Sequence, residues 1–205
     1  MIEQIKIGCA STKTTYGHRL DTTLVELNSD AKISGLFTSN KFKSAPVQIC
    51  LDQFEAKMKG KKMLAINAGN ANAATGKKGV SDAKKLIKEI SNLTNISTAQ
   101  ILPFSTGVVG QLLDMKELSS AFNKCFKNLS KNSWDDFAKA IMTTDTKSKI
   151  IKLPFKAGSK KYHIVGIAKG VGMIEPNMAT TLSYIFTDLK IPELTLRKLH
   201  KRISC

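Results

Sequence analysis

The sequence has no run of about 18 consecutive apolar residues, the length that a membrane-spanning helix requires. Its first residues lack the charged head, apolar middle and small-residue cleavage site of a signal peptide. Disordered and collagen-like classes are also excluded, because 42% of the residues are hydrophobic and only 23% are charged. With 205 residues the chain can bury a sizeable core. We therefore expect a folded, cytoplasmic protein with no membrane partner.

Sequence motifs for metal binding and for disulfide pairing are missing as well. The four cysteines are Cys9, Cys50, Cys125 and Cys205, and no two of them form a CxxC pair. The three histidines are equally dispersed. Because zinc sites are recognised by closely spaced Cys and His residues, we expect reduced thiols and no metal.

Positive charge is abundant, but arginine and aromatic residues are scarce. Lys and Arg number 32 against 16 acidic residues, a formal net charge of +16, while aromatic residues make up 6%. Arginine occurs only at positions 19, 197 and 202. Proteins that read nucleic acids rely on arginine for bidentate contacts and on aromatic rings for stacking. We interpret the lysines as a solvated surface and expect no nucleic-acid partner; a basic module that binds polyanions is the alternative.

The hydrophobic pattern mixes strands and helices throughout, without a repeat or a linker, and so predicts an α/β or α+β domain. Residues 181–186 fit either a strand or a helix. The predicted strands cover residues 5–10, 20–27, 33–38, 48–51, 63–67, 100–104, 149–153 and 162–168. The predicted helices cover residues 81–90, 114–129, 133–141 and 193–201.

Four short segments are rich in Thr, Gly, Asn and Lys, where a structural chain would usually have a simple turn. They are residues 67–72, 105–110, 142–146 and 169–181. The last one contains Ala179 followed by Thr180. Threonine becomes a good nucleophile when a base lies beside it, and the α-amine of an N-terminal threonine can serve as that base.

These segments, together with residues 36–47, resemble the ornithine acetyltransferase family, the bifunctional glutamate N-acetyltransferases of the cyclic arginine pathway. The matching stretches are LFTSNKFKSAPV (36–47), NAGNAN (67–72), STGVVG (105–110), MTTDT (142–146) and KGVGMIEPNMAT (169–180). The resemblance implies a layered α/β sandwich with a mixed sheet and helices. It also implies self-cleavage between Ala179 and Thr180, which gives an α-chain domain of residues 1–179 and the beginning of a β chain at 180–205.

The resemblance further implies a role for each matching residue. Thr180 is the nucleophile, and the Thr106 hydroxyl with the Gly107 N–H stabilises the oxyanion. Thr143, Lys169 and Thr180 bind substrate. The acetyl group passes from N-acetylornithine to glutamate through an acetyl-threonine enzyme. No cofactor and no metal are implied, although acetyl-coenzyme A is a further acetyl donor for some members, and the chains assemble as α/β heterotetramers.

From the residues alone, other interpretations of the same positions remain open. Thr106 and Gly107 fit an ordinary strand-to-helix turn. Thr143 fits a hydroxyl that bonds the backbone at a helix end. Lys169 fits a solvated lysine, and Asn67, Asn70 and Asn72 fit a loop that supports the site.

The chain also departs from the family pattern, because only residues 180–205 follow the expected cleavage site. The resemblance implies a β chain comparable in size to the α chain, so we expect the C-terminal half of the family fold to be missing. We therefore expect this chain to be inactive by itself. An N-terminal-threonine amidase or aminopeptidase, in which water accepts the acyl group, is the alternative enzyme.

Overall fold

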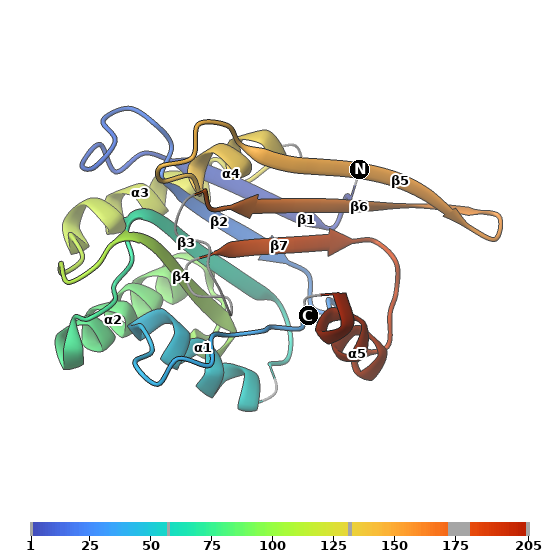
Figure 1. The fold of residues 1–205 in the computed structure, drawn as a ribbon, viewed down its shortest axis with the longest axis horizontal. Helices are drawn as coiled ribbons and strands as arrows, with labels where there is room; N and C mark the ends of the chain where they lie inside the picture. Colours follow the sequence, from blue (N-terminus) through green and yellow to red (C-terminus); the bar gives the residue numbers. More distant parts are fainter. Residues whose placement is uncertain (1, 57, 131–132, 172–180, 204–205) are drawn as a thin grey trace.

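The computed structural model describes residues 2–56, 58–130, 133–171 and 181–203. Strands and helices are mixed along the chain, as the sequence predicts (Figure 1). In chain order the elements are β1 (Ile5–Ala10), β2 (Thr22–Leu27), α1 (Ala45–Glu55), β3 (Lys62–Asn70), α2 (Gly76–Thr94), the 3-10 turn η1 (Thr98–Gln100), β4 (Ile101–Val108), α3 (Met115–Lys127), α4 (Trp134–Ala140), β5 (Lys149–Ala157), β6 (Lys160–Lys169), β7 (Leu182–Thr187) and α5 (Glu193–Ile203).

The first four strands form one mixed sheet, sheet A, in the order β1-β2-β3-β4. β1, β2 and β3 pair antiparallel, whereas β3 and β4 run parallel, with α2 in the crossover between them. Parallel pairing needs such a crossover connection. The carboxyl ends of β3 and β4 therefore lie side by side at one edge of the sheet.

The last three strands form a second, fully antiparallel sheet, sheet B, in the order β5-β6-β7. One face of sheet B packs on sheet A and on α4, through Val165, Ile167, Tyr184, Phe186 and Trp134. The opposite face of sheet A packs on α2 and α3 and on part of α1. The layers are thus helices, sheet A and sheet B, and the hairpin of β5 and β6 extends well beyond the other layers (Figure 1).

Local sequence signals explain the helices next to the site. Asp114 accepts a hydrogen bond from the Glu117 amide (3.1 Å), so it caps α3 in the way that the Asp-x-x-Glu spacing predicts. In α2, Leu86, Ile87 and Ile90 are buried while Lys84, Lys85 and Lys88 are exposed, which confirms the predicted amphipathic helix. Of residues 181–186, which fit either element, residues 182–186 lie in a strand, β7 (Leu182–Thr187).

Two predicted strands are wrong. Residues 48–51 belong to the helix α1, which starts beside Pro46; proline suits the first helical turn because the amide that it lacks has no partner there. Residues 33–38 form neither helix nor strand. Ile33 and Phe37 instead pack their side chains against the core between the sheets, so apolar character buries this segment without strand pairing.

Candidate active site

The parallel strand ends carry the first part of the site, Thr106 and Gly107 at the end of β4. In the register of the pair, Thr106 lies opposite Ala68 and Gly107 opposite Gly69. Gly107 has a φ of +133°, and a Cβ there would lie 2.3 Å from the carbonyl carbon of Gly69. Only glycine lets the two backbones approach this closely. Thr106 and Gly107 therefore do not form a strand-to-helix turn. Both residues lie within the paired part of β4.

Asparagine side chains brace this edge of the sheet. The Ser105 hydroxyl hydrogen-bonds to Asn67 Oδ1 (2.6 Å), and Asn67 Nδ2 donates to the carbonyl of Asn70 (2.8 Å). Asn70 in turn accepts the amide of Asn72 (2.8 Å), whose Nδ2 donates to the carbonyl of Gly79 in α2 (3.0 Å). Asn67 and Asn70 thus belong to β3 and not to a loop, and the hydrogen bonds of the three asparagines connect β3 with β4 and α2.

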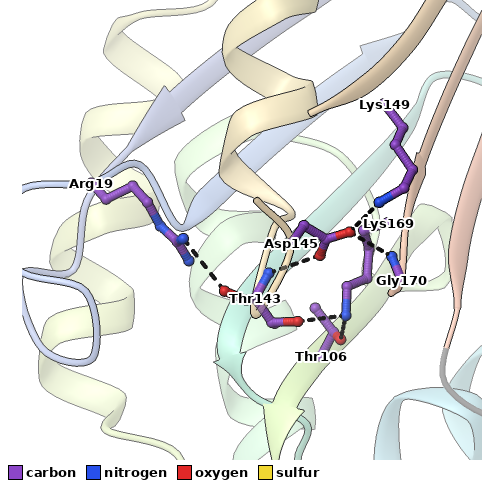
Figure 2. A network of polar contacts seen from close by, with 7 residues as sticks. All are labelled: Arg19, Thr106, Thr143, Asp145, Lys149, Lys169 and Gly170. Carbon is purple, nitrogen blue, oxygen red and sulfur yellow. Dashed lines mark hydrogen bonds and ion pairs between the residues drawn. The ribbon is translucent and has the colours of Figure 1, made fainter. Parts of the chain in front are cut away.

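Lys169, the last residue of β6, brings the separate segments together (Figure 2). Its Nζ lies 2.7 Å from Oγ1 of Thr143 and 3.1 Å from Oγ1 of Thr106. Thr106 belongs to sheet A, Lys169 to sheet B, and Thr143 to the loop after α4. Lys169 is only 5% exposed, so its interpretation as a solvated lysine is wrong. Thr143 Oγ1 contacts an ammonium rather than the helix backbone.

Asp145, which is also buried, places a carboxylate close enough to act on the ammonium and is itself paired with Lys149. The Asp145 carboxylate accepts from Lys149 Nζ (2.5 Å) and from the amides of Gly170 (2.9 Å) and Thr143 (3.3 Å). Burial acts to raise the pKa of Asp145, but these hydrogen bonds outweigh it and the pKa lies below its usual value. Burial lowers the pKa of Lys169, an effect that Asp145 opposes and Lys149 reinforces.

Arg19 fixes the loop that carries Thr143 from the opposite side. Its guanidinium donates to the carbonyls of Met142 (2.8 Å) and Thr143 (3.4 Å) and stacks 3.7 Å from the centre of the Tyr16 ring. Arg19 thus holds the carbonyls of Met142 and Thr143, although it lies more than 120 positions earlier in the chain. This positions the Thr143 hydroxyl facing Lys169 (Figure 2).

The arrangement supplies hydrogen-bond donors in a largely buried setting. A lysine ammonium has three N–H donors and no acceptor, so both threonine oxygens must accept from it. Each hydroxyl hydrogen then remains available to donate to a further oxygen, and so does the third ammonium hydrogen as far as the described residues show. Such a cluster can stabilise a carboxylate or a developing oxyanion.

The structure thus brings together four of the residues that the sequence singles out: Thr106, Gly107, Thr143 and Lys169. Ala179 and Thr180, the expected cleavage site and nucleophile, lie outside the described residues. Two residues with clear contacts in the site, Asp145 and Arg19, were not predicted. Asp145 could have been noticed as a carboxylate in a segment otherwise rich in threonine, whereas no sequence signal connects Arg19 to residue 142.

Other expectations concern the rest of the described chain. Cys9, Cys50 and Cys125 are free and buried, and burial raises the pKa of each thiol, that of Cys9 to about 12. Among the residues described, no cluster of His, Cys, Asp or Glu could hold a metal ion. Nor is any described helix both long and apolar enough to span a bilayer. The lysines of α2 are exposed, as a solvated surface requires.

Comparison with known proteins adds curated relatives that share most of this chain. Two of them are named arginine biosynthesis bifunctional protein ArgJ. The protein from Colwellia psychrerythraea is 37% identical over 212 residues, which cover 99% of this chain and 50% of the relative. The protein from Caldanaerobacter subterraneus subsp. tengcongensis is 41% identical over 181 residues, which cover 88% of this chain and 44% of the relative. The chain spans about half the length of the curated relatives that it matches.

Two crystal structures share the fold. The bifunctional protein ArgJ of Bacillus halodurans superposes with a TM-score of 0.73 at 26% identity, over 87% of this chain and 92% of the matched one. The ornithine acetyltransferase of Mycobacterium tuberculosis, solved in complex with ornithine, gives a TM-score of 0.71 at 25% identity, over 86% and 93%. The family model described as ArgJ family matches residues 4–204. The chain therefore belongs to the ArgJ family.

Proposed function

We propose that this chain carries the acetyl-transfer site of an ornithine acetyltransferase, an enzyme of arginine biosynthesis that moves the acetyl group of N-acetylornithine to glutamate. One observation carries the proposal: Lys169 Nζ joins the hydroxyls of Thr106 and Thr143 in a buried cluster beside Gly107. A related ornithine acetyltransferase of the same fold was solved with ornithine bound. The cluster offers the donors that an α-carboxylate and an acetyl oxyanion require.

In the proposed reaction, the Thr180 hydroxyl attacks the acetyl carbonyl of N-acetylornithine while the Thr180 α-amine takes the hydroxyl proton. The Thr106 hydroxyl and the Gly107 N–H donate to the oxyanion. The proton then moves to the departing ornithine nitrogen, which leaves an acetyl ester on Thr180, and the amine of glutamate attacks this ester in the second half-reaction. Lys169 and Thr143 hold the substrate carboxylate. Loss of one oxyanion donor costs about 2.7–4 kcal/mol in comparable sites.

The nucleophile requires cleavage between Ala179 and Thr180, into segments 1–179 and 180–205. Two observations support this step. The chain covers more than nine-tenths of the matched crystal-structure chain but half of the Colwellia relative, so the crystallised chain is much shorter than that relative. In addition, residues 182–187, which follow the bond between Ala179 and Thr180, pair with β6 and so belong to the same sheet as the strand before the bond.

Intact mass spectrometry of the purified chain tests the cleavage. We expect a species that ends at Ala179 in the wild type and only the uncut mass in Thr180→Ala. Thr181→Ala is the matched control, because it changes a neighbouring hydroxyl and leaves the nucleophile in place. Uncut wild-type chain after prolonged incubation under native conditions would contradict self-cleavage by this chain.

We propose that this chain alone does not complete the reaction, because it lacks half of the length of its relatives. The outer face of sheet B exposes Ile151, Leu153 and Ile185, and contiguous apolar surface of this kind marks an interface. The other half of the family's length would pack there, and the resulting α/β pairs associate further as heterotetramers.

An acetyl-transfer assay tests this division of the enzyme. The chain alone should release no ornithine from N-acetylornithine, whereas co-expression with the second half of the Colwellia relative should restore release. Dependence of this release on glutamate distinguishes transfer from the amidase alternative, in which water suffices. Acetyl-coenzyme A in place of N-acetylornithine tests the further donor, and no bound cofactor is proposed. Transfer by the isolated chain would overturn the proposal.

A further inference from the structure

Asp145 is a buried carboxylate that touches the site without being one of its expected ligands. Its side chain is 1% exposed and lies in the loop between α4 and β5. A buried carboxylate is costly unless hydrogen bonds and an opposite charge compensate for lost hydration. Three donors do so here, and each comes from a different backbone segment of the site.

The three contacts fix three segments relative to one another. Oδ2 accepts from the amide of Thr143, which shapes the loop two residues earlier in the chain. Oδ1 accepts from Nζ of Lys149 at the start of β5 and from the amide of Gly170 just after β6. One carboxylate thereby holds the backbone on both sides of the contact between Lys169 and Thr143 (Figure 2).

Gly170 shows why its amide contact matters. Its φ is +136°, a conformation that L-residues with side chains rarely adopt. The backbone directly after Lys169 therefore has a conformation that suits glycine, and the Asp145 carboxylate accepts a hydrogen bond from its amide. Asp145 thus fixes the backbone at the residue that follows Lys169.

The charges act on Lys169 in opposite directions. Burial has the largest effect and lowers the pKa of Lys169. Of the two charges, Asp145 raises this pKa and Lys149 lowers it. Asp145 and Lys149 are the charged groups that act on the ammonium among the described residues. Lys149 is 47% exposed whereas Asp145 is buried, so each of the two charges can be removed in a separate variant and its effect on Lys169 measured.

We propose that Asp145 is a positioning residue, which holds the Lys169 ammonium between the hydroxyls of Thr143 and Thr106 by anchoring the backbone at Gly170 and the loop at Thr143. The inference rests on the proposed function, because it explains how the donor cluster is preorganised for an acetyl-transfer reaction. Asp145 does not touch the substrate in this proposal; it acts through Lys169 and Thr143.

Lysine-selective NMR of the 205-residue chain, without substrate, tests the proposal. The Lys169 Nζ titration is compared in wild type, Asp145→Asn and Lys149→Met. Asp145→Asn should lower the Lys169 midpoint by about one pH unit, and Lys149→Met should raise it. The slowly exchanging ammonium signal expected of a lysine held by two hydroxyls should be lost in Asp145→Asn and retained in Lys149→Met.

Asp188→Asn is the matched control, since Asp188 is a hydrogen-bonded carboxylate that contacts His163 at the other end of β6. It should leave both the midpoint and the ammonium signal of Lys169 unchanged. An unchanged Lys169 in Asp145→Asn, or equal changes in Asp188→Asn, would overturn the proposal. If Asp145→Asn does not fold, Lys149→Met decides: a raised midpoint supports the proposal and an unchanged or lowered one rejects it.

The outcome is separable from that of the proposed function. The titration needs neither cleavage nor substrate, so a failed acetyl-transfer assay leaves it intact. Conversely, normal transfer with an unchanged Lys169 in Asp145→Asn would reject the positioning role and retain the acetyltransferase.

Discussion

The two sheets of this protein differ in how they are covered. Sheet A lies between the helices and sheet B, so both of its faces are buried. Sheet B is buried only on the face toward sheet A, and its outer face leaves Ile151 and Ile185 more than half exposed. Because Lys169 and Thr106 come from different sheets, the site depends on the packed interface and not on the open face. This difference predicts that the same type of substitution costs more stability at a packed face than on the outer face of sheet B.

Glycine positions should show the largest contrast. A Cβ at Gly8 in β1 would lie 1.9 Å from the carbonyl oxygen of Cys125 in α3, so the helix would have to move away from sheet A. We expect Gly8→Ala to cost about 3 kcal/mol of unfolding free energy or more, since overpacking against backbone is not relieved by rotamer changes.

The partner substitution is Gly166→Ala, on the open face of sheet B between Ile151 and Ile185. Its Cβ would approach only the Ile151 Cγ2 atom, at 3.0 Å, on an exposed side chain that can rotate. We expect a stability within about 0.5 kcal/mol of the wild type or above it, because glycine weakens a strand. Urea unfolding measures both, and equal losses would refute the contrast.

Isoleucine truncation tests the two faces of sheet B itself. Ile167 is 2% exposed and faces sheet A, whereas Ile185 is 56% exposed. Ile167→Ala should lose about 2–5 kcal/mol because it leaves a cavity in the core. Ile185→Ala should lose less than about 1 kcal/mol as long as no partner covers it. A large loss for Ile185→Ala in the isolated chain would show that its outer face is already covered.

Lys169 at the junction of the sheets should separate stability from function. Burial lowers the pKa of its ammonium, so the folded state holds this charge at a cost. Lys169→Met keeps the apolar stem, and we expect a thermal midpoint at or above that of the wild type, with loss of acetyl transfer in the co-expressed protein. Lys152→Met, at a half-exposed ion pair of β5, should change neither. A clearly lower midpoint for Lys169→Met alone would contradict this.

Carboxyl groups of the two sheets should give the smallest effects, with opposite signs. Asp21, just before β2, has its pKa raised by burial despite hydrogen bonds from Thr12. Asp188, just after β7, is subject to burial too, but hydrogen bonds from His163 lower its pKa overall. A raised folded-state pKa makes acid favour folding, whereas a lowered one contributes stability above the ordinary aspartate pKa of about 3.9 that is lost below it.

The measurement is urea unfolding of Asp21→Asn and Asp188→Asn between pH 7 and pH 3. The stability advantage of wild type over Asp188→Asn should shrink as the pH falls. Relative to Asp21→Asn, the wild type should instead gain stability. Trends of the same sign in both variants would show that burial and hydrogen bonding do not differ between the two sites in the way described.

Most of the helices and strands, and several residues of the candidate site, could be predicted from sequence patterns. Strong local signals succeeded: the apolar stripe of α2 and the Asp114 cap of α3 both predict the observed helices. Short apolar runs failed, because four residues such as 48–51 fit a strand and a helix equally well and only Pro46 indicates the helix start.

Long-range contacts account for what could not be predicted. The motif segments indicate which loops matter, and the structure places Thr106, Thr143 and Lys169 within hydrogen-bond distance. The depth at which Lys169 is buried depends on how two sheets pack, which no single segment encodes. The same holds for Arg19, whose contact with Met142 links residues 123 positions apart.

The pairing of Lys169 with Leu182 across β6 and β7 has a thermodynamic consequence for any cut in the intervening residues. The strand pairing of β6 with β7 would hold the two sides together after such a cut. After such a cut, however, unfolding would release two molecules instead of one. The midpoint of thermal unfolding would then rise with protein concentration, whereas that of the uncut chain would stay constant. Dilution alone would therefore reveal whether the backbone is continuous.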